Sequence, residues 1–177
     1  MLKKIERAQQ LLKKEAAVFR CPTCHEPMHV EGVGLICQQR HQFDLSKKGT
    51  LYFLNHGVQT EYNKKMFTSR GKMIQSGMYA PVLNKIMHYL PQNKTVVDVG
   101  CGEGSFLAEL SQAGLSGLKI GFDLSKEGIY LASNQPIDAF WCVADLTNLP
   151  FADQGLDTIL NIFSPSHYQE FRRVIKA

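Results

Sequence analysis

Long apolar runs are missing from this sequence. No stretch approaches the ~18 consecutive apolar residues of a membrane-spanning helix, and the first residues, Met-Leu-Lys-Lys-Ile-Glu, lack the apolar segment of a signal peptide. We therefore expect a cytosolic protein with no membrane partner. Of the 177 residues 44% are hydrophobic, so the chain is able to bury a core, and its length allows one domain or a small domain beside a medium one.

The sequence also lacks a strong overall charge, because its net charge is only +4. The two halves differ, however. Residues 1–94 hold 15 Lys and Arg against 6 Asp and Glu, a net charge of +9, whereas residues 95–177 hold 5 against 10, a net charge of −5. A basic front half on an acidic second half predicts a polyanionic substrate bound by the front half. A basic surface that serves only solubility is the alternative.

The G-x-G-x-x-G spacing of dinucleotide-binding turns is absent. In its place, residues 95–107 read Thr-Val-Val-Asp-Val-Gly-Cys-Gly-Glu-Gly-Ser-Phe-Leu, which predicts a β-branched strand, a glycine-rich turn and a helix start. Two carboxylates at this turn, Asp98 and Glu103, would repel a pyrophosphate and suit a cationic ligand. The sequence therefore predicts a site for a cationic cofactor of the adenosine type, and a strand-turn-helix without a ligand is the alternative.

This turn resembles motif I of the class I S-adenosylmethionine (SAM) methyltransferases, in which acidic residues face the methionine amino group and the sulfonium. Two further short strands each end in an acid. Asp123 follows ~20 residues after the turn, where such folds bind the ribose hydroxyls, and Asp145 matches the acid that the family places by the adenine amino group. The cofactor-binding residues expected around the turn are Asp98, Gly100, Gly102, Glu103, Gly104, Ser105, Phe106 and Leu107.

Cysteine is scarce, with five in the chain, and a cytosolic location disfavours disulfides. Three of the five belong to the pattern Cys21-x-x-Cys24 followed by Cys37-x-x-x-His41. Two close pairs of thiolate or imidazole ligands match structural zinc spacing, because each short knuckle supplies half of a tetrahedron. His25 and His29 are spare candidates for the fourth ligand. A closed four-ligand site leaves no position for water, so we expect this zinc to position the module and not to catalyse.

The remaining segments divide the chain into four parts. Residues 1–18 form a basic helix that either caps the next module, touches RNA or frays. Residues 19–54 form the zinc-binding module, which we expect to be closed by a hairpin that pairs residues 43–45 with 51–53. Residues 55–94 are a connector and leading helices, with Lys64, Lys65, Arg70 and Lys72 as an RNA-binding cluster. Residues 95–177 form the methyltransferase core.

Two side chains outside motif I complete the candidate site. In class I methyltransferases the helix before motif I lends a side chain to the cofactor, and Tyr79 is that candidate here, with a core tyrosine as the alternative. A fourth strand over 156–162 ends near Asn161, Phe163, Ser164 and Pro165, which we expect to face the transferred methyl group, with Phe163 able to stack on an extruded base. Asn161, Phe163 and Ser164 are thus the catalytic candidates, although none of them is a convincing general base.

Zinc pattern, connector and SAM motif, in this order, resemble the RlmA-type 23S rRNA (guanine-N1-)-methyltransferases, and among them the Gram-positive branch linked to tylosin resistance. The motifs that carry the resemblance include Phe-Arg-Cys-Pro-Thr-Cys (19–24), Arg-His-Gln-Phe-Asp-Leu-Ser-Lys (40–47), Gly-Met-Tyr (77–79), Asp-Val-Gly-Cys-Gly-Glu-Gly (98–104) and Ile-Phe-Ser-Pro-Ser-His-Tyr (162–168). The resemblance implies zinc and SAM as bound groups, and a guanine in a 23S rRNA hairpin as the substrate, methylated at N1.

The fold expected is α/β: a small zinc-binding β module followed by a Rossmann-like class I SAM methyltransferase core that is incomplete at its C-terminal side. The family continues beyond the equivalent of Ala177, so four of seven expected strands are present, and the chain is a fragment or a truncated relative. The fourth strand is then an apolar edge that invites another chain, including a second copy in a homodimer. Two rival functions stay open: methylation of a small molecule, and RNA binding without catalysis.

Overall fold

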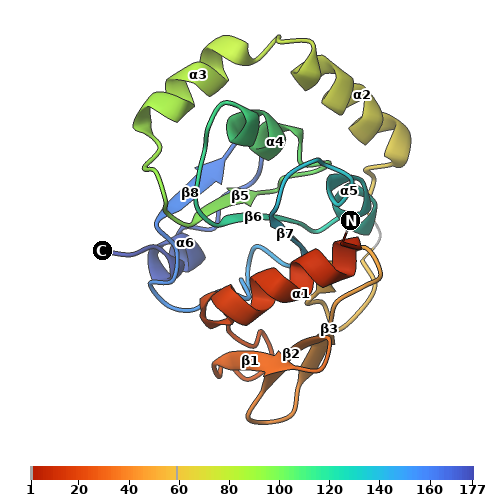
Figure 1. The fold of residues 1–177 in the computed structure, drawn as a ribbon, viewed down its shortest axis with the longest axis vertical. Coiled ribbons are helices and arrows are strands. Elements are labelled where there is room, and N and C mark those ends of the chain that lie inside the picture. The colour runs from red at the N-terminus through yellow and green to blue at the C-terminus, as the bar shows by residue number, and fades with distance from the viewer. Residues whose placement is uncertain (1, 59) are drawn as a thin grey trace.

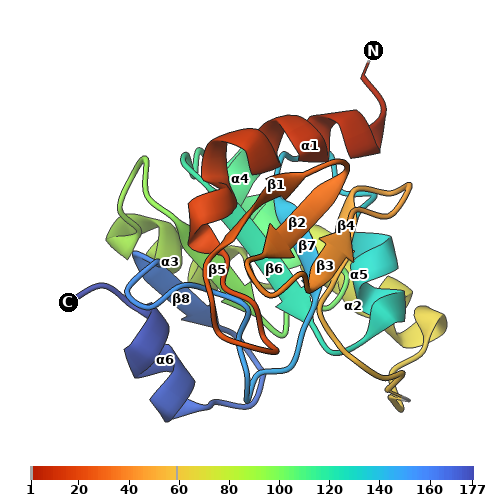
Figure 2. The same ribbon diagram turned by 90° about the horizontal axis from the view of Figure 1, so that it is seen from below.

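The structure is a computed structural model that describes residues 2–58 and 60–177, and it contains a small antiparallel sheet beside a larger parallel sheet (Figures 1 and 2). In chain order the elements are α1 (Lys4–Glu15), η1 (Ala16–Val18), β1 (Met28–Glu31), β2 (Gly34–Cys37), β3 (Gln42–Asp44), β4 (Thr50–Tyr52), α2 (Lys64–Gln75), α3 (Ala80–Tyr89), β5 (Val96–Val99), α4 (Ser105–Gln112), β6 (Lys119–Asp123), α5 (Lys126–Ala132), β7 (Phe140–Val143), β8 (Thr158–Asn161) and α6 (Tyr168–Val174).

The larger sheet confirms the Rossmann-like prediction. Its strand order is β4-β7-β6-β5-β8, and every neighbouring pair is parallel. Strands β5, β6 and β7 are buried along nearly their whole length, as expected for the central strands of a sheet that is covered on both faces. All four strands that the sequence predicted for the core are present, and β8, which was predicted to be an edge, ends the sheet.

The hairpin predicted to close the zinc module is wrong. Strand β3 pairs with β2 in the small sheet, whereas β4 pairs in parallel with β7, with Leu51 opposite Cys142. The physical reason is burial, because Leu51 is 1% exposed and lies in the same apolar cluster as the central strands of the larger sheet. The last strand of the predicted zinc-binding segment therefore extends the larger sheet.

Two apolar cores cover the two faces of the larger sheet. One core joins α1 and the small sheet to β5, β6 and β7, and its largest fully buried side chains include Phe19, Phe122 and Phe140. The other contains residues of α3, α4 and α5 together with Trp141. The basic N-terminal helix is thus a docked cap, since Leu12 is completely buried.

The leading helices confirm their predicted positions and lie over the glycine-rich turn. Helix α2 packs against α4 and α5, and α3 packs against α4, so the two helices arch over one end of the sheet in Figure 1. Helix α2 starts at an Asn63 cap, whose side chain accepts a hydrogen bond from the Met66 amide. None of the helices in the described residues is long and apolar enough to cross a membrane.

Candidate functional site

The predicted zinc ligands come together. Cys21, Cys24, Cys37 and His41 each offer one ligand atom, and these atoms lie within 4.8 Å of one another. The Sγ atoms of Cys24 and Cys37 are 3.5 Å apart, and the His41 Nδ1 is 3.3 Å from the Cys37 Sγ. Zinc bonds of about 2.3 Å to sulfur and 2.0 Å to nitrogen in a tetrahedron would separate the ligands by roughly 3.5 to 3.8 Å. The four residues therefore fit a structural zinc ion, and the spare candidates His25 and His29 lie outside the cluster.

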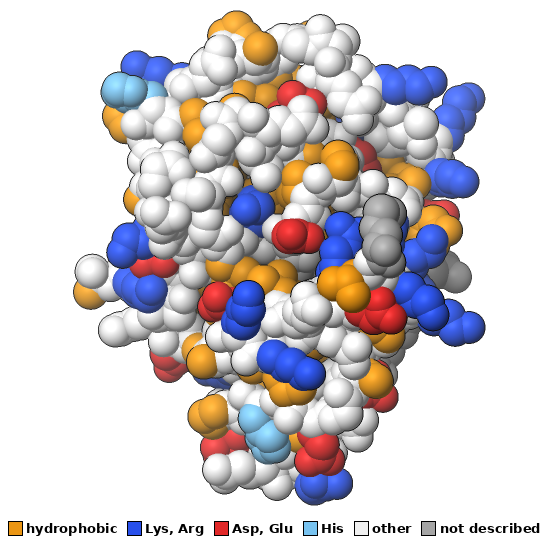
Figure 3. Space-filling view, in the orientation of Figure 1, with side chains coloured by type: hydrophobic (Ala, Val, Ile, Leu, Met, Phe, Trp, Pro, Cys, Tyr) orange, Lys and Arg blue, Asp and Glu red, His pale blue; other side chains and the backbone are white. Residues whose placement is uncertain are grey.

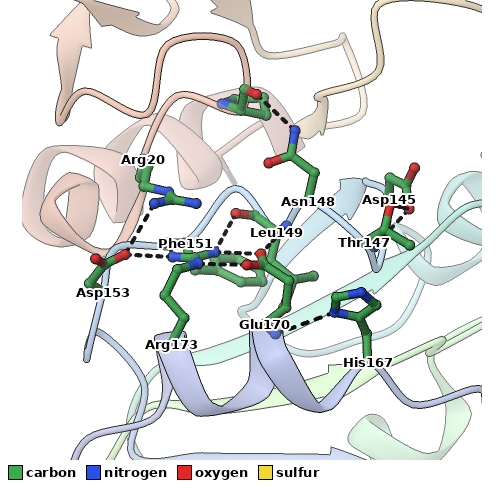
Figure 4. Close-up of polar contacts among 11 residues, drawn as sticks. Arg20, Asp145, Thr147, Asn148, Leu149, Phe151, Asp153, His167, Glu170 and Arg173 are labelled. Atoms are coloured by element: carbon green, nitrogen blue, oxygen red, sulfur yellow. Dashed lines mark hydrogen bonds and ion pairs between the residues drawn. The ribbon is translucent and has the colours of Figure 1, made fainter.

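Polar contacts hold the zinc module against the loop that follows β7 of the larger sheet. Figure 4 shows Arg20, from the module, and Arg173, from α6, meeting at Asp153, with distances to its Oδ1 of 3.2 Å and 2.8 Å. The hydrogen bond from Arg173 holds the pKa of Asp153 below its ordinary value. The Asn148 amide donates to the carbonyl oxygen of Pro22, between the first two zinc ligands, at 2.8 Å. Because these contacts span both parts of the chain, they hold the module in one place.

The glycine-rich turn between β5 and α4 depends on the absence of side chains. Gly100, Gly102 and Gly104 all have positive φ angles, which favour glycine. A Cβ at Gly100 would lie 2.6 Å from the Ser164 Cβ, and a Cβ at Gly102 would lie 2.7 Å from the Arg70 Nη1. The turn therefore lets other groups approach its backbone closely.

Three carboxylates surround this turn. Asp98 is 1% exposed and Glu103 is 5% exposed. Within the described residues the Asp98 Oδ2 and both Glu103 carboxylate oxygens have no hydrogen-bond partner. Burial raises the pKa of Asp98 to about 7, although Arg70 opposes the rise. Buried acceptors without donors are costly, so this side of the turn is suited to a ligand that brings a positive charge or N–H groups.

Asp123 also supports the turn. Its Oδ2 accepts a hydrogen bond from the Gly102 amide at 2.9 Å, and its Oδ1 accepts one from the Ser125 amide at 2.7 Å. Burial raises the pKa of Asp123, against the effect of these backbone hydrogen bonds. Asp145 is exposed, and its Oδ1 accepts hydrogen bonds from both the amide and the hydroxyl of Thr147.

A cavity of about 460 Å³ lies where β5, β6 and β7 end, between these acids and α2. Six of the predicted site residues line it: Gly100, Asp123, Asp145, Phe163, Ser164 and Pro165. Other predicted residues are close to the turn without lining the cavity, namely Tyr79, Asp98, Gly102, Glu103, Gly104, Ser105, Phe106, Leu107 and Asn161. The other lining residues were not predicted from the sequence, namely Tyr62, Met66, Phe67, Arg70, Val99, Phe122, Leu124, Ala144 and Leu146.

Tyr79 packs among aromatic rings beside the cavity. Its ring lies edge-on to Phe106 with centroids 5.3 Å apart, and 5.7 Å from the centroid of Phe163. Leu107 is completely buried in the core. The side chains at the start of α4 thus support the turn from below.

The predicted methyl-facing loop follows β8. Asn161 donates to the Ser166 hydroxyl at 2.6 Å, and its Oδ1 also contacts the Ser164 hydroxyl, which reaches the Val99 carbonyl oxygen at 2.6 Å. Phe163 is 77% exposed and has a φ of 58°, a left-handed conformation that is uncommon for an aromatic residue. The loop therefore presents an exposed aromatic ring beside the cavity.

The side chains of the predicted cluster on α2 point in different directions from the helix. Phe67, Gly71 and Ile74 face inwards at helical spacing, and Arg70 lies beside them, so it lines the cavity. Lys64, Lys65 and Lys72 are exposed instead. Figure 3 shows Lys and Arg side chains gathered along the right-hand edge, the side on which α2 lies in Figure 1.

Comparison with known proteins agrees with a zinc-binding module followed by a Rossmann-like sheet. A family model described as "RlmA, N-terminal" matches residues 19–55, and one described as "Methyltransferase domain" matches residues 96–177. A SAM-dependent methyltransferase structure from Aquifex aeolicus superposes with a TM-score of 0.52 at 19% identity, over 66% of this chain and 69% of that one. These findings define the class: a zinc ribbon joined to a Rossmann-like methyltransferase domain.

Two relatives narrow the class to a family. The chain is 41% identical over 172 residues to YxjB of Bacillus subtilis, assigned to the 23S rRNA (guanine-N(1)-)-methyltransferases, which covers 90% of this chain and 61% of YxjB. It is 27% identical over 172 residues to the 23S rRNA (guanine(748)-N(1))-methyltransferase of Streptomyces fradiae, over 93% of this chain and 61% of that protein. Residues 19–55 thus match the RlmA-type ribbon, the chain is similar to these methyltransferases along most of its own length, and it spans about three fifths of the length of these relatives.

Proposed function

We propose that this chain transfers the methyl group of SAM to N1 of a guanine in a 23S rRNA hairpin. The observation that carries the proposal is the cavity of about 460 Å³ at the carboxyl ends of the strands, which is lined by Asp123, Asp145 and the exposed Phe163 and lies beside the turn that buries Asp98 and Glu103. Ligands of open α/β sheets bind at this end of the strands. The RlmA-type ribbon on the same chain favours ribosomal RNA as the substrate.

The acids around the turn suit each part of the cofactor. Asp123 would accept hydrogen bonds from the ribose hydroxyls, and Asp145 would accept one from the adenine amino group. Asp98 and Glu103 would face the amino group and the sulfonium, which explains why their oxygens are buried without partners. A positive ligand favours ionised carboxylates, so binding would reverse the effect of burial on Asp98.

The guanine would enter from the Phe163 side. Its N1 atom is buried in a Watson–Crick pair, so the base must be unpaired or extruded before reaction. Phe163 would stack on that base, and Asn161 and Ser164 would hydrogen-bond its edge. The protein would then accelerate the in-line displacement mainly by holding N1 against the methyl group. The N1 proton needs an acceptor or a stabilised O6 enolate, and we assign neither role to a residue.

The ribbon would hold zinc through Cys21, Cys24, Cys37 and His41 and would position RNA without touching the reacting atoms. Exposed lysines of the basic front half, including Lys64 and Lys65, would bind RNA phosphates. This substrate would place the protein in the cytoplasm. The edge strand β8 offers a place for a second copy, and a homodimer is part of the same proposal.

Transfer of tritiated methyl groups from SAM to transcripts of 23S rRNA hairpins tests the proposal. We expect label in a hairpin that disappears in the Asp98→Ala and Cys24→Ser variants. A small-molecule enzyme would label no RNA, and an RNA-binding protein without catalysis would retain the hairpin on a filter without labelling it. Either result would contradict the proposal.

A further inference from the structure

Arg70 occupies an unusual place for an arginine on a basic helix. It lies on α2 and lines the cavity, with its guanidinium carbon 5.5 Å from the centre of the Phe106 ring. Its Nη1 also lies close above the turn, at 2.7 Å from where a Cβ of Gly102 would be. Within residues 2–58 and 60–177 the guanidinium forms no hydrogen bond and no ion pair. An arginine that is stacked on an aromatic ring and packed against backbone keeps its planar donors oriented for a ligand.

Arg70 lies near buried acids without forming an ion pair with them in the described residues. The positive charge of Arg70 lowers the pKa of both Asp98 and Asp123, although burial has the larger effect and raises the pKa of each. Neither carboxylate lies within ion-pair distance of the guanidinium. Among the described side chains that line the cavity, Arg70 is the one cation, and it faces a turn bordered by acids. The cavity therefore presents negative groups and a single positive fork to whatever lies over Gly100 and Gly102.

We propose that Arg70 binds the α-carboxylate of the amino-acid part of SAM, and of the product S-adenosylhomocysteine. This inference rests on the proposed function. The amino-acid part is a zwitterion, so a site with acids alone would attract its amino group and repel its carboxylate. Arg70 supplies the missing cation, and a guanidinium binds a carboxylate through two parallel N–H···O hydrogen bonds. Arg70 is therefore a cofactor-binding residue. It does not belong to the RNA-binding cluster that the sequence predicted from Lys64, Lys65, Arg70 and Lys72.

The inference predicts a selective effect that depends on the ligand. 5′-Methylthioadenosine keeps the adenosine and the sulfur but has neither the carboxylate nor the amino group. Truncation of Arg70 should weaken S-adenosylhomocysteine about 10- to 100-fold, the usual range for losing hydrogen bonds to a charged group. The same truncation should leave 5′-methylthioadenosine within about twofold of its original affinity.

Calorimetric titration of both ligands into the full chain tests this. The proteins are the parent, Arg70→Ala, Arg70→Lys, which keeps the charge but loses the fork, and Lys85→Ala, which removes an exposed cation from α3. We expect Arg70→Lys to bind S-adenosylhomocysteine with intermediate affinity and Lys85→Ala to match the parent. Circular dichroism checks that each variant is folded, and Arg70→Lys carries the test if Arg70→Ala does not fold.

Three outcomes would overturn the inference. Equal weakening of both ligands in the Arg70 variants would assign Arg70 to the packing of α2. Unchanged affinity for both would return Arg70 to the RNA-binding cluster. A parent that binds neither ligand would refute the proposed function itself, and with it this inference. The first two outcomes leave the proposed function intact, so the failures are distinguishable.

Discussion

Replacing Asp98 with Asn should stabilise the ligand-free protein at neutral pH. Asp98 is completely buried beside Glu103 and Asp123, and burial raises its pKa from 3.8 to about 7. Because the folded pKa is the higher one, the folded state favours the protonated form. The contribution of protonated Asp98 to the stability of the folded state is fully present below pH 3.8 and is lost as the pH rises through about 7. A change of one in pKa corresponds to about 1.4 kcal/mol, so ionising Asp98 at pH 8 costs roughly 4 kcal/mol.

Asn resembles the protonated carboxyl in shape and carries no charge to bury. We therefore expect Asp98→Asn to raise the free energy of unfolding by about 2 to 4 kcal/mol at pH 8, and by little at pH 4. Urea unfolding followed by tryptophan fluorescence measures this difference. The chain has one tryptophan, Trp141, which is buried in β7, so the signal reports the methyltransferase core.

Asp138→Asn is the matched control, because the Asp138 side chain is 76% exposed and distant from the turn in sequence. It should change the free energy of unfolding by less than about 0.5 kcal/mol. The Asp98 variant should also bind SAM at least tenfold more weakly, since it loses the charge that we propose faces the amino group of the cofactor. A variant that is equally stable or less stable than the parent at every pH would refute the electrostatic account of this turn.

Three further predictions concern the zinc ribbon, the ribose contact and the exposed lysines. We expect the parent to contain roughly one zinc ion per chain and the Cys24→Ser variant to contain none. The variant should also have a lower unfolding midpoint, as reported by Trp141, because the ribbon shares its apolar core with the sheet. Metal analysis that finds no zinc in the parent would contradict this. Asp123→Ala should weaken SAM by about 1 to 3 kcal/mol in a titration, and equal affinities would place the ribose contact elsewhere. In a Lys64→Ala, Lys65→Ala double variant, the slope of log binding constant against log salt concentration for an rRNA hairpin should fall by a little under one for each phosphate that is no longer neutralised. SAM affinity should be unchanged. An unchanged slope would show that these lysines do not bind RNA.

The sequence predicted the elements whose signals are local. The run of valines before Gly100 marks a central strand, and close Cys and His pairs mark a zinc site, because each pattern needs only neighbouring residues to be recognised. The predicted strands that end in Asp123 and Asp145 likewise meet at one edge of the sheet, since the carboxyl ends of parallel strands lie together.

Features that depend on distant partners were not predictable in this way. A short apolar strand such as β4 has the same pattern whether it forms a hairpin or pairs in parallel with β7, some 90 residues away. The buried face of α2 was not predictable from the apolar pattern, because Gly71 contributes no side chain to it. Arg70 was therefore grouped with the surface cations. The meeting of Arg20 and Arg173 at Asp153 depends on the folded arrangement alone.

Primer extension on 23S rRNA tests the central claim most directly. A methyl group on guanine N1 blocks Watson–Crick pairing, so reverse transcriptase stops beside the modified base. After incubation of the chain with SAM and unmodified 23S rRNA, we expect one new stop at a hairpin guanine that requires SAM and is absent with Asp98→Asn. Nucleoside analysis should identify the product as 1-methylguanosine. The absence of any SAM-dependent stop, or methylation at another atom, would contradict the proposal that this chain is a guanine-N1 methyltransferase.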